Sequence, residues 1–120
     1  MKKILVVDDE KKIRKIYVKL LSAEGYEVVE SLNPMQASEI LVKERIDLVL
    51  LDINMPEVDG SVLYDVMQLF HKKVKVIVAS VYPLDEQKHR IKDAYDYYDK
   101  SDGSEILLYK IKKALENGVS

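Results

Sequence analysis

Short continuous apolar runs alternate along this chain with stretches in which apolar residues recur at helical spacing. A short apolar run is typical of a strand buried on both faces, whereas apolar residues three and four apart are typical of a helix with one buried face. The runs predict five strands, at residues 2–7, 26–30, 46–51, 74–79 and 95–99. The alternation indicates a parallel sheet covered by helices on both faces.

The stretches between the runs predict five helices. The first carries apolar residues from Ile13 onward and stops at Gly25, because glycine readily adopts the left-handed conformation that ends helices. Asn33 followed by Pro34 is a helix-start signal for the second. At the end of the fourth helix stands Asp93, and aspartate tolerates the left-handed conformation better than most residues. The last three helices are expected at about residues 59–70, 84–93 and 103–117.

Five β/α units fit a small doubly wound α/β fold with a five-stranded parallel sheet. Crossovers between parallel strands are right-handed, which leaves few topologies. We expect the flavodoxin-like strand order 2-1-3-4-5, in which the first and third strands lie side by side. Ligands of such sheets bind outside the carboxyl ends of the strands, so that edge is where chemistry is expected.

Composition narrows the class of protein. The 120 residues carry a net charge of −2 and scattered basic residues, which gives no electrostatic case for nucleic-acid binding. Cysteine is absent, so disulfides and thiolate metal sites are excluded. No apolar run approaches the ~18 residues of a membrane helix, and no signal-peptide pattern opens the chain. We expect one cytoplasmic domain over residues 1–120 without an output domain.

Candidate site residues follow four of the five predicted strands. Asp8 and Asp9 follow the first strand, Asp52 the third, Ser80 the fourth and Lys100 the fifth. Parallel strands end at the same edge of a sheet, and neighbours are about 4.8 Å apart. We therefore expect three carboxylates, a hydroxyl and an ammonium group to meet at one place.

Three neighbouring carboxylates repel one another and attract a cation. Two unit charges ~4 Å apart cost about 4 kcal/mol at an effective dielectric of ~20. Oxygen ligands without histidine or cysteine favour Mg²⁺, which in turn attracts phosphoryl groups. Asp8 and Asp9 are adjacent and point in different directions, which suits metal binding. We expect Asp9 to bind Mg²⁺ directly, Asp8 to bind through water, and Asp52 and the backbone carbonyl of Asn54 to complete the ligands.

Asp52 is the expected nucleophile, because it stands alone at the end of the most buried strand. A carboxylate in that role becomes an aspartyl phosphate. Lys100 and Ser80 are placed to pair with the phosphoryl oxygens, the first as a charge and the second as a hydrogen-bond donor.

The segments that carry these residues resemble the bacterial response-regulator receiver domain over the whole chain. They are VVDDE at residues 6–10, LDINMPEVDG at 51–60, VAS at 78–80 and YYDK at 97–100. The resemblance implies a stand-alone receiver that takes a phosphoryl group from a histidine kinase or histidine phosphotransfer protein on Asp52, with Mg²⁺. It also implies a switch that couples Ser80 to Tyr97, signalling to a protein partner or phosphorelay, and no enzymatic turnover beyond slow autodephosphorylation.

Two departures from the family pattern bear on the site. The family usually has a proline in a cis bond after the lysine, whereas Lys100 is followed by Ser101. A cis bond without proline costs about 2.5–4 kcal/mol, so either a trans bond displaces Lys100 or the fold holds strain. Bulky Val81 and Tyr82 follow Ser80, and we expect them to shield the acyl phosphate and slow its hydrolysis.

Other interpretations remain open. A degenerate receiver would act only as a phosphorylation-independent binding module, and the missing proline is compatible with that role. A phosphohydrolase of the haloacid-dehalogenase type would need Asp-x-Asp after the first strand, where this chain has Asp8-Asp9-Glu10. A flavin-binding protein would need a loop rich in small polar residues there, because acids repel the flavin phosphate. Tyr97 could instead be an ordinary core residue.

Overall fold

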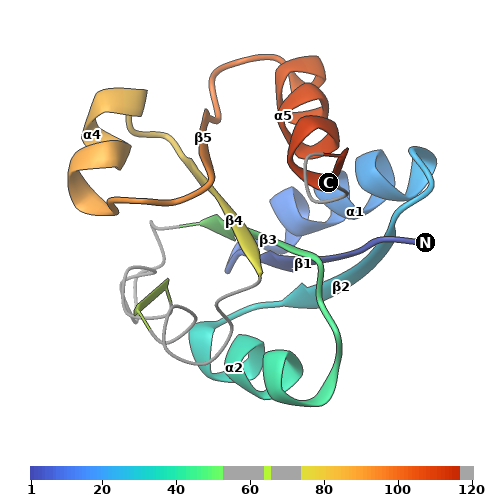
Figure 1. The fold of residues 1–120 in the computed structure, drawn as a ribbon. Coiled ribbons are helices and arrows are strands. Elements are labelled where there is room, and N and C mark those ends of the chain that lie inside the picture. The colour runs from blue at the N-terminus through green and yellow to red at the C-terminus, as the bar shows by residue number, and fades with distance from the viewer. Residues whose placement is uncertain (53–63, 66–73, 117–120) are drawn as a thin grey trace.

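A computed structural model of the chain describes residues 1–52, 64, 65 and 74–116. Its centre is one parallel sheet of five strands in the order β2-β1-β3-β4-β5 (Figure 1). The strands are β1 (Lys3–Val7), β2 (Glu27–Ser31), β3 (Leu48–Asp52), β4 (Lys75–Ser80) and β5 (Asp96–Asp99). The predicted fold class and strand order are confirmed, with each strand within two residues of its expected bounds.

Four helices lie in the described part of the chain: α1 (Lys11–Ala23), α2 (Pro34–Lys43), α4 (Leu84–Arg90) and α5 (Ser104–Glu116). The helix expected at residues 59–70 falls outside the described residues except for Tyr64 and Asp65, which are both helical. No helix in the described residues is long and apolar enough to cross a membrane.

The helix ends follow the local sequence signals. Gly25 has a φ of +90°, the left-handed conformation that glycine adopts without steric cost, and it follows the end of α1. The side chain of Asn33 accepts a hydrogen bond from the N–H of Gln36 at 2.8 Å and so caps α2. Asp93 has a φ of +67°, as expected from its place after α4.

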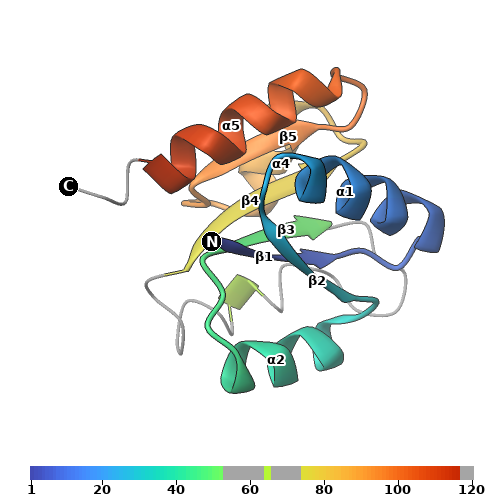
Figure 2. The ribbon, with the colours of Figure 1, turned by 90° about the vertical axis from the view of Figure 1, so that its right-hand side faces the viewer.

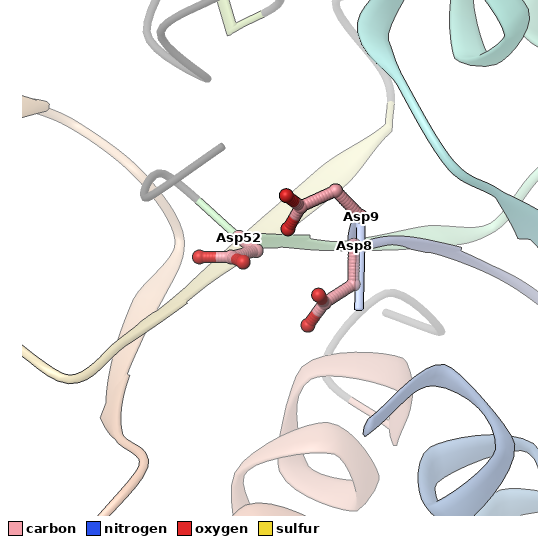
Figure 3. A group of neighbouring side chains, drawn as sticks. All are labelled: Asp8, Asp9 and Asp52. Atoms are coloured by element: carbon pink, nitrogen blue, oxygen red, sulfur yellow. The ribbon is translucent and has the colours of Figure 1, made fainter. Parts of the chain in front are cut away.

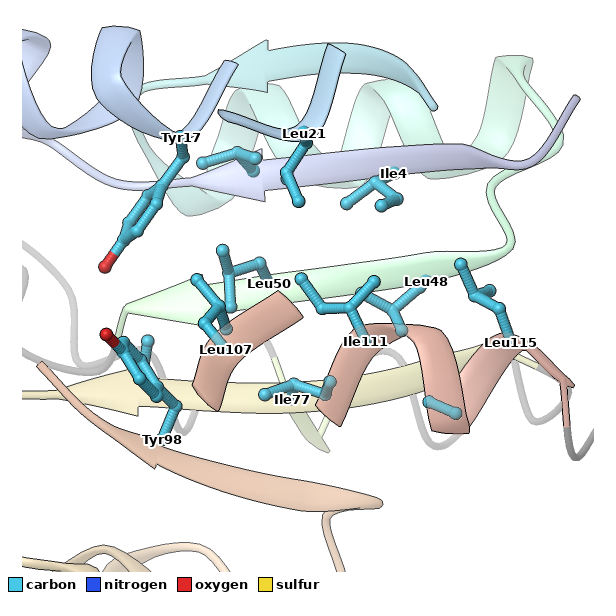
Figure 4. Close-up of a cluster of buried hydrophobic side chains, with 13 residues drawn as sticks. Ile4, Tyr17, Leu21, Leu48, Leu50, Ile77, Tyr98, Leu107, Ile111 and Leu115 are labelled. Carbon is cyan, nitrogen blue, oxygen red and sulfur yellow. The ribbon is translucent and has the colours of Figure 1, made fainter. Parts of the chain in front are cut away.

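Helices cover both faces of the sheet, and each face has its own core. α1 and α5 lie on one face, whereas α2 lies on the other, with α4 at the β4–β5 end of the molecule (Figures 1 and 2). Side chains of β1, β3 and β4 alternate between the two cores. The α1/α5 core includes Ile4, Leu50, Ile77 and Leu107, all nearly inaccessible to solvent (Figure 4). Burial of each such side chain contributes roughly 1.5–3 kcal/mol, which holds the strand ends in fixed register.

Candidate functional site

The carboxylates that end β1 and β3 meet at one edge of the sheet. Val7 pairs with Leu51 in the parallel ladder, so the residues that follow them, Asp8 and Asp52, lie side by side. Carboxylate oxygens of Asp8, Asp9 and Asp52 all lie within 4.8 Å of one another, and the side chains of Asp8 and Asp9 point in different directions (Figure 3). Asp8 is 1% exposed and Asp52 5% exposed, whereas Asp9 is open to solvent.

Backbone contacts fix the orientation of Asp8. Its N–H donates to the carbonyl of Ser31 on β2 at 3.1 Å, and its Oδ1 accepts from the N–H of Glu10 at 2.9 Å. Its own carbonyl accepts from Arg14 Nη1 at 2.8 Å. Arg14 is 8% exposed, and its Nε donates to Glu30 Oε1 at 3.2 Å. Arg14 was not among the predicted site residues, because it contacts the cluster through a backbone carbonyl, which no sequence pattern marks.

Lys100 supplies the positive charge of the site. Its Nζ lies 3.2 Å from Asp8 Oδ2 and 3.4 Å from Asp52 Oδ2, and its side chain is 15% exposed. No peptide bond among the described residues is cis, so the bond between Lys100 and Ser101 is trans. The trans bond does not keep the ammonium group away from the acidic cluster. Among the described residues, Lys100 thus forms ion pairs with two of the three clustered carboxylates, Asp8 and Asp52.

Ser80 ends β4 and is fully buried. Its Oγ accepts from the N–H of Tyr82 at 3.0 Å, and its carbonyl accepts from the N–H of Lys100 at 2.8 Å. Ser80 pairs with Asp99 across the β4–β5 ladder, which brings the ends of these two strands together. The hydroxyl and the ammonium predicted to contact a phosphoryl group are therefore tied to neighbouring strand ends.

Tyr97 is buried between β5 and the segment that follows α4. Its ring is 8% exposed and belongs to the core on the α2 face of the sheet. Its hydroxyl donates to the carbonyl of Ile91 at 2.6 Å and accepts from the N–H of Ala94 at 3.2 Å. This position fits the interpretation of Tyr97 as an ordinary core residue. Its hydroxyl also joins β5 to the end of α4.

A buried glutamine links α4 to both strand ends. Gln87 Nε2 donates to the carbonyls of Tyr82 at 2.8 Å and Tyr98 at 2.9 Å. Gln87 is fully buried, and its Oε1 has no hydrogen-bond partner in the described part of the chain. No sequence pattern predicts this contact, because a glutamine in a short polar helix is normally solvated.

The phenol of Tyr17 lies in the α1/α5 core near the acids. Burial, followed by the charges of Tyr98, Asp8 and Asp52, raises the pKa of Tyr17 above the usual phenol range. The phenol therefore stays neutral at physiological pH and adds no charge to the cluster.

The donor set suits a hard divalent cation. The group contains only carboxylate oxygens, one of them exposed, and no histidine or cysteine. Such ligands favour Mg²⁺, which keeps several waters and needs only one or two protein carboxylates. The fourth predicted ligand, the carbonyl of Asn54, lies outside the described residues. Of the predicted site residues, the structure thus brings Asp8, Asp9, Asp52 and Lys100 together directly.

Known proteins are similar to this chain in amino-acid sequence. Sporulation initiation phosphotransferase F of Bacillus subtilis (strain 168) is 39% identical over 80 residues, which cover 67% of this chain and 64% of that protein. The probable transcriptional regulator ycf27 of Porphyridium aerugineum is 35% identical over 117 residues, covering 94% of this chain and 48% of that protein. The chain therefore spans about half to just under two thirds of the length of these two curated relatives.

A solved structure extends the likeness to three dimensions. The response regulator protein TrrA of Thermotoga maritima, crystallised in complex with Mg²⁺-BeF, is 34% identical, with a TM-score of 0.84. The alignment covers 96% of this chain and all of that one. The family model of the response regulator receiver domain matches residues 4–112. With the strand order, the acidic cluster and the lysine at its centre, this match shows that the chain belongs to the response-regulator receiver domain family.

Proposed function

We propose that this receiver domain accepts a phosphoryl group on Asp52 from a phosphohistidine of a histidine kinase or a histidine phosphotransfer protein, in a reaction that needs Mg²⁺. The observation that carries the proposal is the meeting of three carboxylates with Lys100 at the ends of β1, β3 and β5. Carboxylates placed close together repel one another and so destabilise the folded protein. A phosphoacceptor site explains why they are nevertheless placed together.

In the transfer, a carboxylate oxygen of Asp52 attacks the phosphorus atom and forms an O–P bond. The P–N bond of the phosphohistidine breaks, and its electron pair leaves with the imidazole nitrogen. With acetyl phosphate as donor, the P–O bond breaks instead and acetate leaves. Lys100 Nζ, 3.4 Å from Asp52 Oδ2, is close enough to pair with an oxygen of the incoming phosphoryl group.

The acidic cluster holds the metal in this proposal. Asp9 would bind Mg²⁺ directly and Asp8 through water, and Asp52 and the carbonyl of Asn54 would complete the protein ligands. The metal would supply positive charge that offsets the charge of the phosphoryl oxygens. The complex of the relative TrrA with Mg²⁺-BeF supports the assignment, as does the exposure of Asp9 beside two buried carboxylates.

Ser80 and Tyr97 form the proposed switch. When the Ser80 hydroxyl donates to a phosphoryl oxygen, the hydroxyl turns inward and its bond from the Tyr82 N–H is lost. The motion passes to the segment between β4 and α4 and through α4 to its C-terminal end, where the Tyr97 hydroxyl of β5 donates to the Ile91 carbonyl. A hydrogen bond to a charged group is worth roughly 1.5–3 kcal/mol, whereas nearly complete switching needs about 5.5 kcal/mol. Contacts of Lys100 or of a bound partner supply the difference.

The domain over residues 1–120 acts in the cytoplasm, either as an intermediate in a phosphorelay or by contact with a protein target. The name of its relative, a sporulation initiation phosphotransferase, supports the relay role. Its own chemistry is limited to accepting the phosphoryl group and releasing it slowly to water. The intact acidic cluster and its lysine argue against a degenerate binding module.

Intact-mass measurement after incubation with acetyl phosphate tests the proposal. Wild type should gain one phosphoryl group with Mg²⁺ and none with excess EDTA, and Asp52→Ala should gain none. Tyr109→Phe, which alters an exposed residue on α5, serves as a control and should behave as wild type. A gain that persists in Asp52→Ala would assign the acceptor to another residue, and no gain in wild type with either acetyl phosphate or a phosphorylated histidine kinase would favour the binding module.

A further inference from the structure

The turn that follows Lys100 is held by side chains from the end of β5. The Tyr98 hydroxyl donates to the carbonyl of Asp102 at 2.7 Å and lies 3.3 Å from that of Gly103. Asp99 Oδ1 accepts from the N–H of Ser101 at 2.9 Å and from its hydroxyl at 2.7 Å. The N–H of Asp102 donates to the Asp99 carbonyl at 2.9 Å. The four residues between β5 and α5 thus have one defined conformation.

Tyr98 itself has little freedom to move. It is 3% exposed, and its ring packs in the α1/α5 core with the hydroxyl directed toward the end of the strands (Figure 4). Its carbonyl accepts from Gln87 Nε2 at 2.9 Å, which anchors the residue on the α4 side as well. Burial, together with the nearby charges of Asp102 and Asp99, raises the pKa of Tyr98, so the hydroxyl keeps the proton that it donates.

The position of Lys100 depends on this turn. A lysine side chain is a flexible stem of four carbons. The places that its ammonium group can reach therefore depend on where the backbone holds the residue. On one side, the N–H of Lys100 is fixed by the Ser80 carbonyl at 2.8 Å. On the other side, the backbone runs into the turn that the Tyr98 hydroxyl closes. With both sides held, the ammonium group reaches Asp8 and Asp52 at once.

We propose that Tyr98 is a positioning residue for phosphoryl transfer. The hydrogen bond from its hydroxyl to the Asp102 carbonyl fixes the β5–α5 turn, and this turn directs Lys100 toward the acidic cluster. The inference rests on the proposed function and assigns it a residue outside the acidic cluster. Phenylalanine would fill the same apolar space, so packing alone does not explain the buried hydroxyl. A buried hydroxyl is costly unless it is hydrogen-bonded, and this one is bonded to the turn that follows Lys100.

The first test compares Tyr98→Phe with wild type in the rate of Asp52 phosphorylation by acetyl phosphate at saturating Mg²⁺. The rate should fall about fivefold, the equivalent of one lost hydrogen bond. The dissociation constant for Mg²⁺ should not rise, because all three carboxylates remain. Tyr109→Phe removes an exposed hydroxyl from α5 and should leave both quantities unchanged. A wild-type rate in Tyr98→Phe would overturn the proposal.

A double-mutant cycle separates positioning from general damage to the fold. If Tyr98 acts through Lys100, then Tyr98→Phe should lower the rate in the wild-type background and have no effect in a Lys100→Met background. An equal loss in both backgrounds would show that the hydroxyl acts on stability alone and would overturn the proposal.

Chemical labelling tests the placement without phosphorylation. Lys100 should react slowly with acetic anhydride in metal-free wild type, and about fivefold faster in Tyr98→Phe, with exposed Lys112 as the internal reference. Unchanged labelling would overturn the positioning of Lys100 by Tyr98. Faster labelling in a protein that takes up no phosphoryl group would support the positioning while refuting the proposed function.

Discussion

The N–H of Lys100 donates to the carbonyl of Ser80 at 2.8 Å, one residue beyond the last paired position of the β4–β5 ladder. The two groups proposed to contact phosphoryl oxygens from outside the acidic cluster are therefore joined by one backbone hydrogen bond. A shift of the Ser80 backbone must move the backbone of Lys100 as well, or break this bond. In the proposed mechanism, the backbones of Ser80 and Lys100 therefore move together.

Lys100→Met should lower the rate of phosphorylation by acetyl phosphate about tenfold to a hundredfold, the equivalent of one charge-assisted hydrogen bond. Phosphorylation should still require Mg²⁺, because the carboxylates remain. Intact-mass time courses at several Mg²⁺ concentrations measure both effects. Lys112→Met, which removes an exposed charge from α5, should match wild type. An unimpaired rate in Lys100→Met would contradict the assigned contact.

Asp9→Asn should stabilise the metal-free protein and abolish the effect of Mg²⁺ on its stability. The substitution removes one of three clustered negative charges, and because Asp9 is exposed we expect a gain of only about 1 kcal/mol. Urea unfolding with EDTA and with Mg²⁺ measures both parts. In wild type, Mg²⁺ should raise the free energy of unfolding by mass action. A variant that is still stabilised by Mg²⁺ would remove Asp9 from the metal ligands.

Ser101→Ala should raise the pKa of the Asp99 carboxyl toward its ordinary value. Hydrogen bonds from the Ser101 hydroxyl and N–H lower that pKa in the folded protein. Since the folded pKa lies below the unfolded one, the stabilisation is present above the unfolded pKa and is lost as pH falls through the folded pKa. An NMR titration of the carboxyl carbon measures the shift. Ser101→Thr keeps the hydroxyl and should keep the lowered pKa, whereas an unchanged pKa in the alanine variant would contradict the assignment.

Tyr82→Ala should shorten the half-life of the phosphorylated protein several-fold. The Tyr82 ring stacks against the guanidinium of Arg90 at 4.1 Å, and its backbone bonds to Ser80 Oγ and Gln87 Nε2, so the residue is well fixed beside the end of β4. We expect its bulk to limit the access of water to the acyl phosphate. Loss of the phosphoryl mass after removal of the donor gives the half-life. An unchanged half-life would show that Tyr82 does not shield the group.

The sequence predicted the candidate site residues that lie at the ends of strands. Continuous apolar runs mark buried parallel strands, and a polar residue that ends such a run must lie at the carboxyl edge of the sheet. Asp8, Asp52, Ser80 and Lys100 could therefore be grouped from their positions along the chain alone. The left-handed backbone conformation of Asp93 and the helix cap at Asn33 were also predictable, because each depends on residues that are close in sequence.

Contacts made by single side chains across elements could not be predicted. Arg14, Gln87 and Tyr98 each bond to a backbone carbonyl, and carbonyls are identical at every position of the sequence. Hydrophobic periodicity places a residue on a face of a helix or strand, but it does not say which carbonyl lies opposite. For the same reason, the sequence raised doubt about Lys100 without its usual proline and did not reveal the bonds of Tyr98 and Asp99 that hold the turn.

The Asp8–Lys100 ion pair joins positions 92 residues apart, and this separation governs how the protein is made. At about 5–20 residues per second, a ribosome completes the acids several seconds before their cation. Until β5 joins the sheet, a growing chain that has already paired β1 with β3 carries the carboxylates without the ammonium that offsets them. Addition of β5 therefore brings in the ammonium group that pairs with Asp8 and Asp52, so the strand that completes the sheet also offsets the repulsion at its acidic edge.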